Sequence, residues 1–73
     1  MAKYNGHRSW NAWNVSLWIY NDENMYFLAL DLVRRHGKRR AAFKLAAALE
    51  GQRTPDGAKY NLTCIREALA DME

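Results

Sequence analysis

The sequence predicts an all-α fold, a compact bundle of three main helices plus a shorter C-terminal helix, formed by residues 1–73 as one small domain. Apolar residues recur at spacings of three and four in four successive segments, which is typical of helices that bury one face. Residues that cap helices precede three of these segments, and Gly37 and Gly51 end two of them. A β class is disfavoured because only residues 10–20 suggest a strand, and no partner strand is evident.

The first helix is predicted to follow a polar N-terminal arm, residues 1–8, with Ser9 as its N-cap. Residues 9–26 contain all three tryptophans and two of the four tyrosines. Each aromatic side chain can bury roughly 150–250 Å², so we expect this stretch to form the middle of the core. Trp10, Trp13, Leu17 and Tyr20 share helical spacing. Residues 13–19 also alternate as a strand would, so helix is favoured for residues 10–20 but strand stays open.

Two further helices are predicted on either side of Gly37. Asn21-Asp22-Glu23 supplies a capping side chain and carboxylates at the start of the first of them. Cations in its last turn favour an end at Gly37, which can take the left-handed cap conformation. The next helix should run from about Lys38 to Glu50 and end at Gly51. Its five alanines predict a slim helix that its neighbours can approach closely.

The last third of the chain is predicted as a loop and a short helix. Residues 52–60 form the loop, because Thr54-Pro55-Asp56-Gly57 suits a tight turn. Asn61 or Thr63 then caps the C-terminal helix. The predicted core takes apolar residues from all four helices: Trp13, Leu17, Leu28, Leu32, Phe43, Leu45, Leu49, Ile65 and Leu69.

Composition limits the classes of protein that fit. The single cysteine, Cys64, excludes an internal disulfide and favours a reducing compartment. Residues 1–6 lack the apolar region of a secretory signal, and no run reaches the 18 or so apolar residues of a membrane span. We therefore expect a soluble protein of the cytoplasm that has no membrane partner.

The strongest functional candidate is a basic cluster around Gly37. The net charge is only +3, but six of the eleven lysines and arginines lie within residues 34–44: Arg34, Arg35, Lys38, Arg39, Arg40 and Lys44. Three of these cations would stand at the start of a helix, where positive charge is unfavourable by about 0.3–1 kcal/mol each. An anionic partner, either a phosphate backbone or an acidic protein surface, would explain that arrangement. A solvated turn that aids solubility is the alternative.

Other functional chemistry has little support in the sequence. We expect Trp10 or Trp18 to stay partly exposed as a contact for a partner or a homodimer, since one helix cannot bury residues on every side. Sequence-specific DNA reading is disfavoured, because the turn at Gly37 is too short for a helix-turn-helix motif. Capping accounts for the adjacent acids at residues 22 and 23, and His7, His36 and Cys64 have no metal-site spacing. We predict no catalysis, no metal and no cofactor, and Cys64 as a small buried residue.

The aromatic stretch has a distinctive pattern, Trp-x-x-Trp-x-Val-x-Leu-Trp-x-x-Asn-Asp-Glu-x-x-Tyr, from Trp10 to Tyr26. Together with Tyr4-Asn5-Gly6 and Thr54-Pro55-Asp56-Gly57, it resembles a family of small uncharacterised proteins of bacteriophages and mobile elements. The resemblance implies expression in bacterial cytoplasm and an accessory protein that binds a host component. Inhibitors of defence systems such as CRISPR or restriction belong to that class. No residue role follows from the resemblance.

These observations together predict a non-enzymatic, phage-type accessory protein that binds a host or viral protein or ribonucleoprotein through its basic surface. Its sharpest form is an anti-CRISPR or anti-restriction inhibitor. The alternatives are a non-specific nucleic-acid-binding module, which would contact phosphates, and a small homo-oligomeric structural or assembly protein. The chain would act as a monomer or a homodimer. Binding to phosphates should weaken steeply as ionic strength rises, whereas binding centred on aromatic contacts should not.

Overall fold

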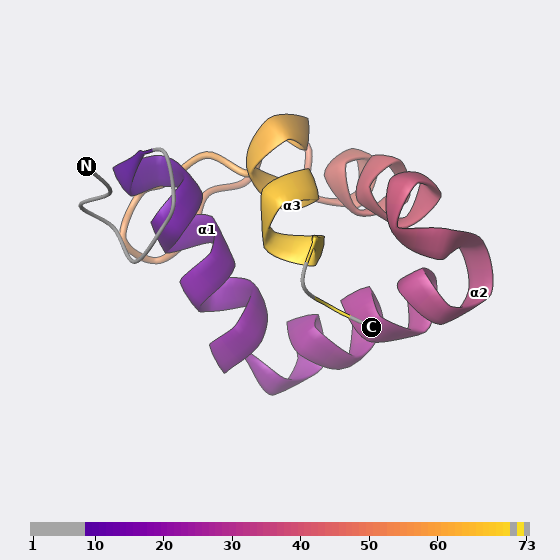
Figure 1. Cartoon of the computed structure of the whole chain (residues 1–73). Coiled ribbons are helices and arrows are strands. Elements are labelled where there is room, and N and C mark those ends of the chain that lie inside the picture. Colours follow the sequence, from indigo (N-terminus) through magenta and orange to yellow (C-terminus); the bar gives the residue numbers. More distant parts are fainter. Residues whose placement is uncertain (1–8, 71, 73) are drawn as a thin grey trace.

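The computed structural model describes residues 9–70 and residue 72. It contains three helices, α1 (Trp10–Asn21), α2 (Glu23–Ala48) and α3 (Leu62–Leu69), arranged compactly as Figure 1 shows. In this part of the chain the only β pairing is an isolated antiparallel bridge between Arg53 and Lys59. The all-α prediction is confirmed. The predicted arm, residues 1–8, lies outside the described residues.

Helix α1 begins directly after Ser9, the predicted N-cap. The Ser9 hydroxyl accepts a hydrogen bond from the Ala12 N–H at 3.1 Å, and the Ser9 carbonyl accepts from the Trp13 N–H at 3.0 Å. The helix continues without a break to Asn21, so the strand alternative for residues 10–20 is wrong. Its buried face consists of Ala12, Asn14, Val15 and Ile19.

One residue, Asp22, separates α1 from α2 and caps both. Its backbone N–H donates to the Trp18 carbonyl at 3.0 Å, which ends α1. Its carboxylate accepts from the Met25 N–H at 3.0 Å, which begins α2. A single residue therefore joins the two helices at a sharp bend, visible at the bottom of Figure 1.

Helix α2 is interrupted at Gly37, so its two segments correspond to the second and third predicted helices. Gly37 has φ 84° and ψ 162°. The positive φ was expected, but this ψ belongs to an extended region that is essentially restricted to glycine and not to the left-handed helical cap. The backbone therefore bends at Gly37, and helix resumes beyond it until the C-cap at Leu49.

The predicted turn and the last helix are also present. Within residues 52–60, the Gly57 N–H donates to the Thr54 carbonyl at 2.8 Å, and the Thr54 N–H donates to the Ala58 carbonyl at 2.8 Å. Of the two candidate caps for α3, the structure selects Asn61, whose side chain accepts from the Cys64 N–H at 2.8 Å.

Helix α3 packs against both α1 and α2 and occupies the centre of the molecule (Figure 1). The core is built mostly from aliphatic and small side chains: Ala12, Val15, Ile19, Ala29, Val33, Ala41, Ala42, Leu45, Leu49, Ala58, Cys64, Ile65, Ala68, Leu69 and Met72. The predicted burial of Leu45, Leu49, Ile65, Leu69 and Cys64 is confirmed.

Residues 9–26 do contribute Val15 and Ile19 to the core, but the expectation that their aromatic side chains form its middle is wrong. Trp13 and Leu17 are only half-buried, as is Leu32, and Phe43 and Leu28 are 54% and 44% exposed. Three helices of modest length enclose a small volume, and alanines from each of them fill much of it. The largest side chains are therefore left half-buried or exposed around it.

Among the described residues, no helix has both the length and the apolar character that crossing a membrane requires.

Candidate anion-binding groove

The six cations of the predicted basic cluster surround the bend at Gly37, and all six are exposed. Arg35 has a partner on its own helix, and Lys38 has one at the C-cap of α3. Arg35 forms an ion pair with Asp31 at 3.0 Å, four residues earlier. Lys38 donates from Nζ to the Ala70 carbonyl at the end of α3, where the negative end of the helix dipole favours a cation.

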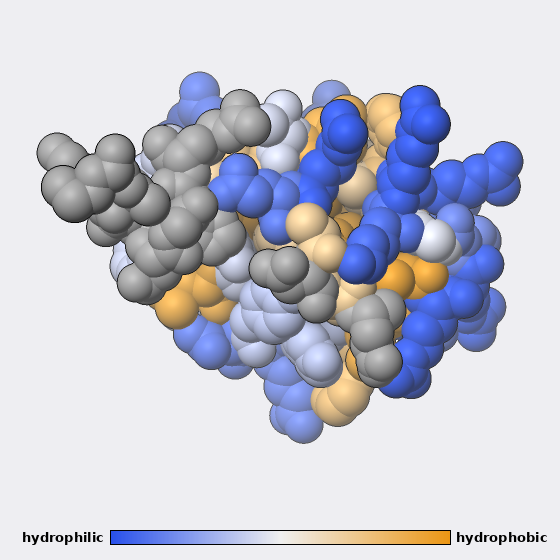
Figure 2. All heavy atoms as spheres, viewed as in Figure 1, coloured by the Kyte–Doolittle hydropathy of each residue, from blue (hydrophilic) through white to orange (hydrophobic). Residues whose placement is uncertain are grey.

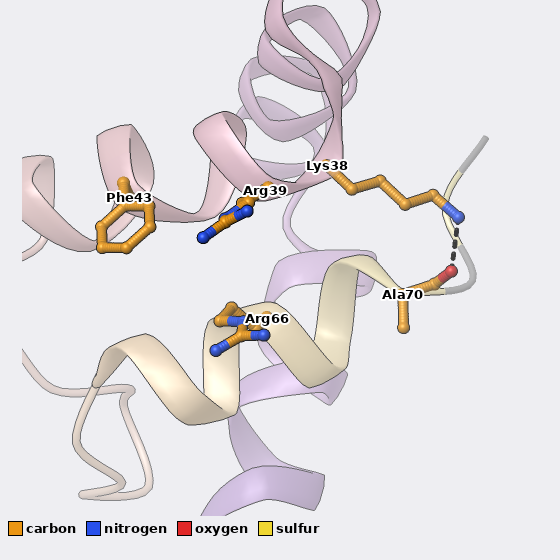
Figure 3. A pocket seen from close by; sticks show the side chains of 5 residues that line it. All are labelled: Lys38, Arg39, Phe43, Arg66 and Ala70. Carbon is orange, nitrogen blue, oxygen red and sulfur yellow. Dashed lines mark hydrogen bonds between the residues drawn. The ribbon is translucent and has the colours of Figure 1, made fainter.

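An open groove of about 640 Å³ lies between the second segment of α2 and α3. Figure 3 shows its lining side chains: Lys38, Arg39, Phe43, Arg66 and Ala70. Arg39 and Phe43 are four residues apart and so lie on the same face of α2. Arg66 reaches toward the same space from α3 (Figure 3). The groove thus brings together two cations, Arg39 and Arg66, that are 27 positions apart in the sequence and belong to different helices.

The described lining of the groove carries an excess of positive charge, which favours an anion. Its described lining residues include three cations and no carboxylate. In the part of the chain that the structure describes, neither Arg39 nor Arg66 forms an ion pair. A guanidinium presents several N–H donors in a planar fork that matches a phosphate or carboxylate. Two such groups from facing helices would repel each other when empty and could both bind one anionic segment.

The bend at Gly37 adds a second contribution of the same sign. Because the helix restarts after Gly37, Lys38, Arg39 and Arg40 stand in the first turn of a new helical segment. The partial positive charge of a helix start makes cations unfavourable there and favours an anion. The structure therefore does place these three cations in the first turn of a helical segment, where the sequence predicted that positive charge is unfavourable.

Sequence reasoning missed Arg66. Along α3 it is an exposed position beside the buried Ile65, and such a position is ordinarily a solvated surface charge. Its relation to Arg39 depends on how α3 packs against α2, and no local pattern in the sequence signals that packing. Of the predicted cluster, Lys38 and Arg39 line the groove, whereas Arg34, Arg35, Arg40 and Lys44 do not.

The two tryptophans proposed as contacts lie on α1 and not at the groove. Trp10 is 40% exposed, and its role as a contact stays a prediction. Trp18 is half-buried, and its indole Nε1 donates to the Asp56 carboxylate at 2.9 Å. Trp18 therefore has a structural function, because it fastens the turn at residues 54–57 to α1.

That turn is held to α1 by a network of polar side chains. Asn14 is buried, donates from Nδ2 to Asp56 Oδ2 at 2.9 Å, and accepts from the Thr54 hydroxyl. Asn14 first and Trp18 second keep the pKa of Asp56 below its ordinary value of 3.8, because both stabilise its charged form. Nearby, Asn11 exchanges hydrogen bonds with the backbone of Lys59 at 2.9 and 2.8 Å. Among the described residues, no buried side-chain polar atom lacks a partner.

The network explains two parts of the sequence pattern together, the aromatic and asparagine-rich stretch of α1 and the Thr-Pro-Asp-Gly turn. A family model described as "Family of unknown function (DUF7249)" matches residues 1–73. The chain belongs to this family. No curated protein and no solved structure matches the chain. The family has no known function, so membership in DUF7249 assigns no activity to the chain.

The described residues of this DUF7249 chain contain no group of side chains arranged as a catalytic site. Asp22 is occupied as a cap, and His36 is exposed on the basic face. Cys64 is buried, and its Sγ accepts from Asn11 Nδ2 at 3.2 Å. Residues 9–70 and 72 contain no cluster of three histidine, cysteine or carboxylate side chains that would hold a metal. His7 lies outside the described residues.

A second surface feature of the DUF7249 chain is an apolar ridge on the first segment of α2. Phe27 and Leu28 are 57% and 44% exposed. The Tyr26 ring contacts both Tyr20 and Phe27, with centroid distances of 5.8 and 5.7 Å. Figure 2 shows the more general character of the surface, in which long hydrophilic side chains stand over and between apolar areas.

Proposed function

We propose that this DUF7249 protein is a non-catalytic binding protein that holds an anionic macromolecule of the host or of a virus on the basic surface around Gly37. The observation that carries the proposal is the groove in which Lys38, Arg39 and Arg66 converge with no carboxylate among its described lining residues. Charges gathered from two elements make a more specific binding surface than a run of cations along one solvated turn.

The sharper form of the proposal is a phage-type accessory protein of the bacterial cytoplasm that inhibits a defence system such as CRISPR or restriction. Its support is the resemblance of the aromatic pattern to small proteins of bacteriophages and mobile elements, together with the basic groove. A defence complex that acts on nucleic acid has the phosphates of its substrate at its site of action, and a ribonucleoprotein also carries the phosphates of its own RNA. A small basic protein could bind such phosphates and block their use.

The proposal is tested by capture of partners from bacterial lysate, with and without nuclease, at low and high ionic strength. The variant Arg39→Glu with Arg40→Glu reverses the charge of Arg39, which lines the groove, and of its exposed neighbour Arg40, so it should fold normally and lose the captured partner. Arg53→Glu is the matched control, because Arg53 is exposed but does not line the groove.

The outcomes separate the alternatives. A discrete protein or ribonucleoprotein that survives nuclease and is lost only in the double variant would support the inhibitor. Recovery of bulk nucleic acid alone, released at higher salt, would replace the inhibitor with a phosphate-binding module. Equal capture by the wild type, the double variant and the Arg53→Glu control would refute any role for the basic surface.

A further inference from the structure

We infer that the groove between α2 and α3 binds single-stranded nucleic acid, with an unpaired base stacked on the Phe43 ring and adjacent phosphates bound by Arg39 and Arg66. This inference rests on the proposed function and narrows it, because it names the class of anion and the group that recognises it.

Phe43 is the residue that distinguishes this groove from a simple basic patch. Its side chain is 54% exposed, although it has no polar atom that would gain from contact with water. The neighbouring Ala42 and Leu45 are fully buried, so the core is closed without it. Figure 3 shows the ring at the groove, on the same side of α2 as Arg39. A flat apolar ring in this place is suited to covering the face of another ring.

The arrangement of Phe43 among cations matches what proteins use to hold single strands. Such sites combine a positively charged groove that follows the backbone with aromatic side chains on which bases stack. Here the ring lies one helical turn from Arg39, and Arg66 approaches from α3. A nucleotide carries a phosphate and a flat base in one small unit, so it can meet both kinds of group in a groove of about 640 Å³.

Duplex nucleic acid and acidic proteins fit the groove less completely. A duplex keeps its bases stacked inside, so it would meet the cations and leave the Phe43 ring uncovered. An acidic peptide would supply carboxylates but no flat face in a fixed relation to them. Single strands therefore use more of the groove than either competitor.

The groove should tolerate different base sequences. Base edges are read by side chains such as Asn, Gln, Asp and Glu as well as by Arg, and the described lining contains none of the first four. Stacking on a phenyl ring accepts every base, because every base has an aromatic face.

The test is fluorescence anisotropy of the full chain with labelled oligothymidylate and with a duplex of the same length, over a range of salt concentrations. Phe43→Leu keeps an apolar side chain but removes the aromatic face, and it should weaken single-strand binding by about 5- to 150-fold. Phe43→Trp should retain binding. Phe27→Leu is the matched control, since Phe27 is equally exposed on the other segment of α2 and should leave binding unchanged.

The salt dependence tests the phosphate contacts independently. Arg39→Glu and Arg66→Glu should each lower single-strand affinity and reduce the slope of log affinity against log salt by about 0.7. Helical circular dichroism and thermal melting of each variant establish that it is folded.

The failures of the inference and of the proposed function are distinguishable. Equal binding of single strand by Phe43→Leu and the wild type, or equal affinity for duplex, would overturn the stacking site while leaving the basic surface intact. A different result would also overturn the stacking site: the protein binds no oligonucleotide but captures an acidic protein, and Arg39→Glu abolishes that capture. The proposed function would then stand. If neither Arg39→Glu nor Arg66→Glu changes any binding, both the stacking site and the proposed function are refuted.

Discussion

Asn14 offers the sharpest test of how the fold is held together. It is 1% exposed in the middle of α1, where its side chain donates to Asp56 at 2.9 Å and accepts from the Thr54 hydroxyl at 2.5 Å. The substitution Asn14→Ala removes both hydrogen bonds and leaves α1 able to form. The turn at residues 54–57 would then lose its central attachment to α1.

The magnitude follows from the burial of these groups. Each lost hydrogen bond contributes about 0.5–1.5 kcal/mol net, and a buried donor left without an acceptor costs about 1–3 kcal/mol. Thr54 is only 4% exposed, so its hydroxyl belongs to the second case. Alanine returns about 0.6 kcal/mol of helix propensity relative to asparagine. We expect a net loss of about 2–3 kcal/mol, a substantial part of the roughly 4–11 kcal/mol typical of a chain of this length.

Urea unfolding and thermal melting, followed by circular dichroism, measure this loss. For a chain of this size, we expect the melting temperature to fall by about 10–20 °C. Asn24→Ala is the matched control, because Asn24 is exposed on α2 and should change stability by less than about 0.5 kcal/mol. If the two variants melt together, the network around Asn14 does not hold the turn and the reasoning is wrong.

Two further perturbations test the backbone at the bend and the charge at the turn. Gly37→Ala should destabilise by about 1–3 kcal/mol through backbone strain alone, because nothing lies within 4 Å of the added Cβ. Gly37→Asn should not rescue it, since asparagine tolerates the left-handed helical region and not ψ 162°; urea midpoints matching wild type would refute this. Asp56 has a lowered pKa, so it stabilises the fold above its unfolded pKa, and that contribution is lost as pH falls through the folded pKa. In Asp56→Asn, the free energy of unfolding should therefore depend less on pH below about pH 5. If urea unfolding shows the same pH dependence as the wild type in that range, the role of the Asn14 and Trp18 hydrogen bonds is contradicted.

The starts of the helices could be predicted because their causes are local, whereas the helix after Gly37 ends at Ala48 and not at the predicted Gly51. Ser9, Asp22 and Asn61 each cap a helix through a backbone N–H three residues later, so a short window of sequence contains the whole interaction. Gly37 was recognisable for the same reason, although its ψ was not. Capping chemistry and glycine conformations do not depend on what lies elsewhere in the fold.

The core was less predictable because burial depends on which faces of the helices meet. Phe43 and Leu28 follow helical spacing as well as Leu45 does, yet the first two are exposed and Leu45 is fully buried. Alanines such as Ala41 and Ala42 are fully buried instead. Asparagine has a low helix propensity, and the presence of Asn11 and Asn14 in α1 is explained by their partners some 40 to 50 positions later.

The candidate groove was half predictable for the same reason. Arg39 was identified from the local density of charge, which is a property of the sequence. Arg66 and the exposed ring of Phe43 enter only through the packing of α3 against α2. Charge clustering thus located the surface, and the tertiary structure supplied the second wall and the aromatic group.

The attachment of α1 has a consequence for how the protein is made. Its side-chain hydrogen bonds to the turn and to α3 join residues 38 to 53 positions apart. At ribosomal rates of about 5–20 residues per second, a nascent chain spends roughly 2–10 s with α1 synthesised and these partners still missing. During that interval the tryptophans and the apolar face of α1 lack their native cover, so the chain must complete its folding after α3 emerges and is open to chaperones or aggregation until then.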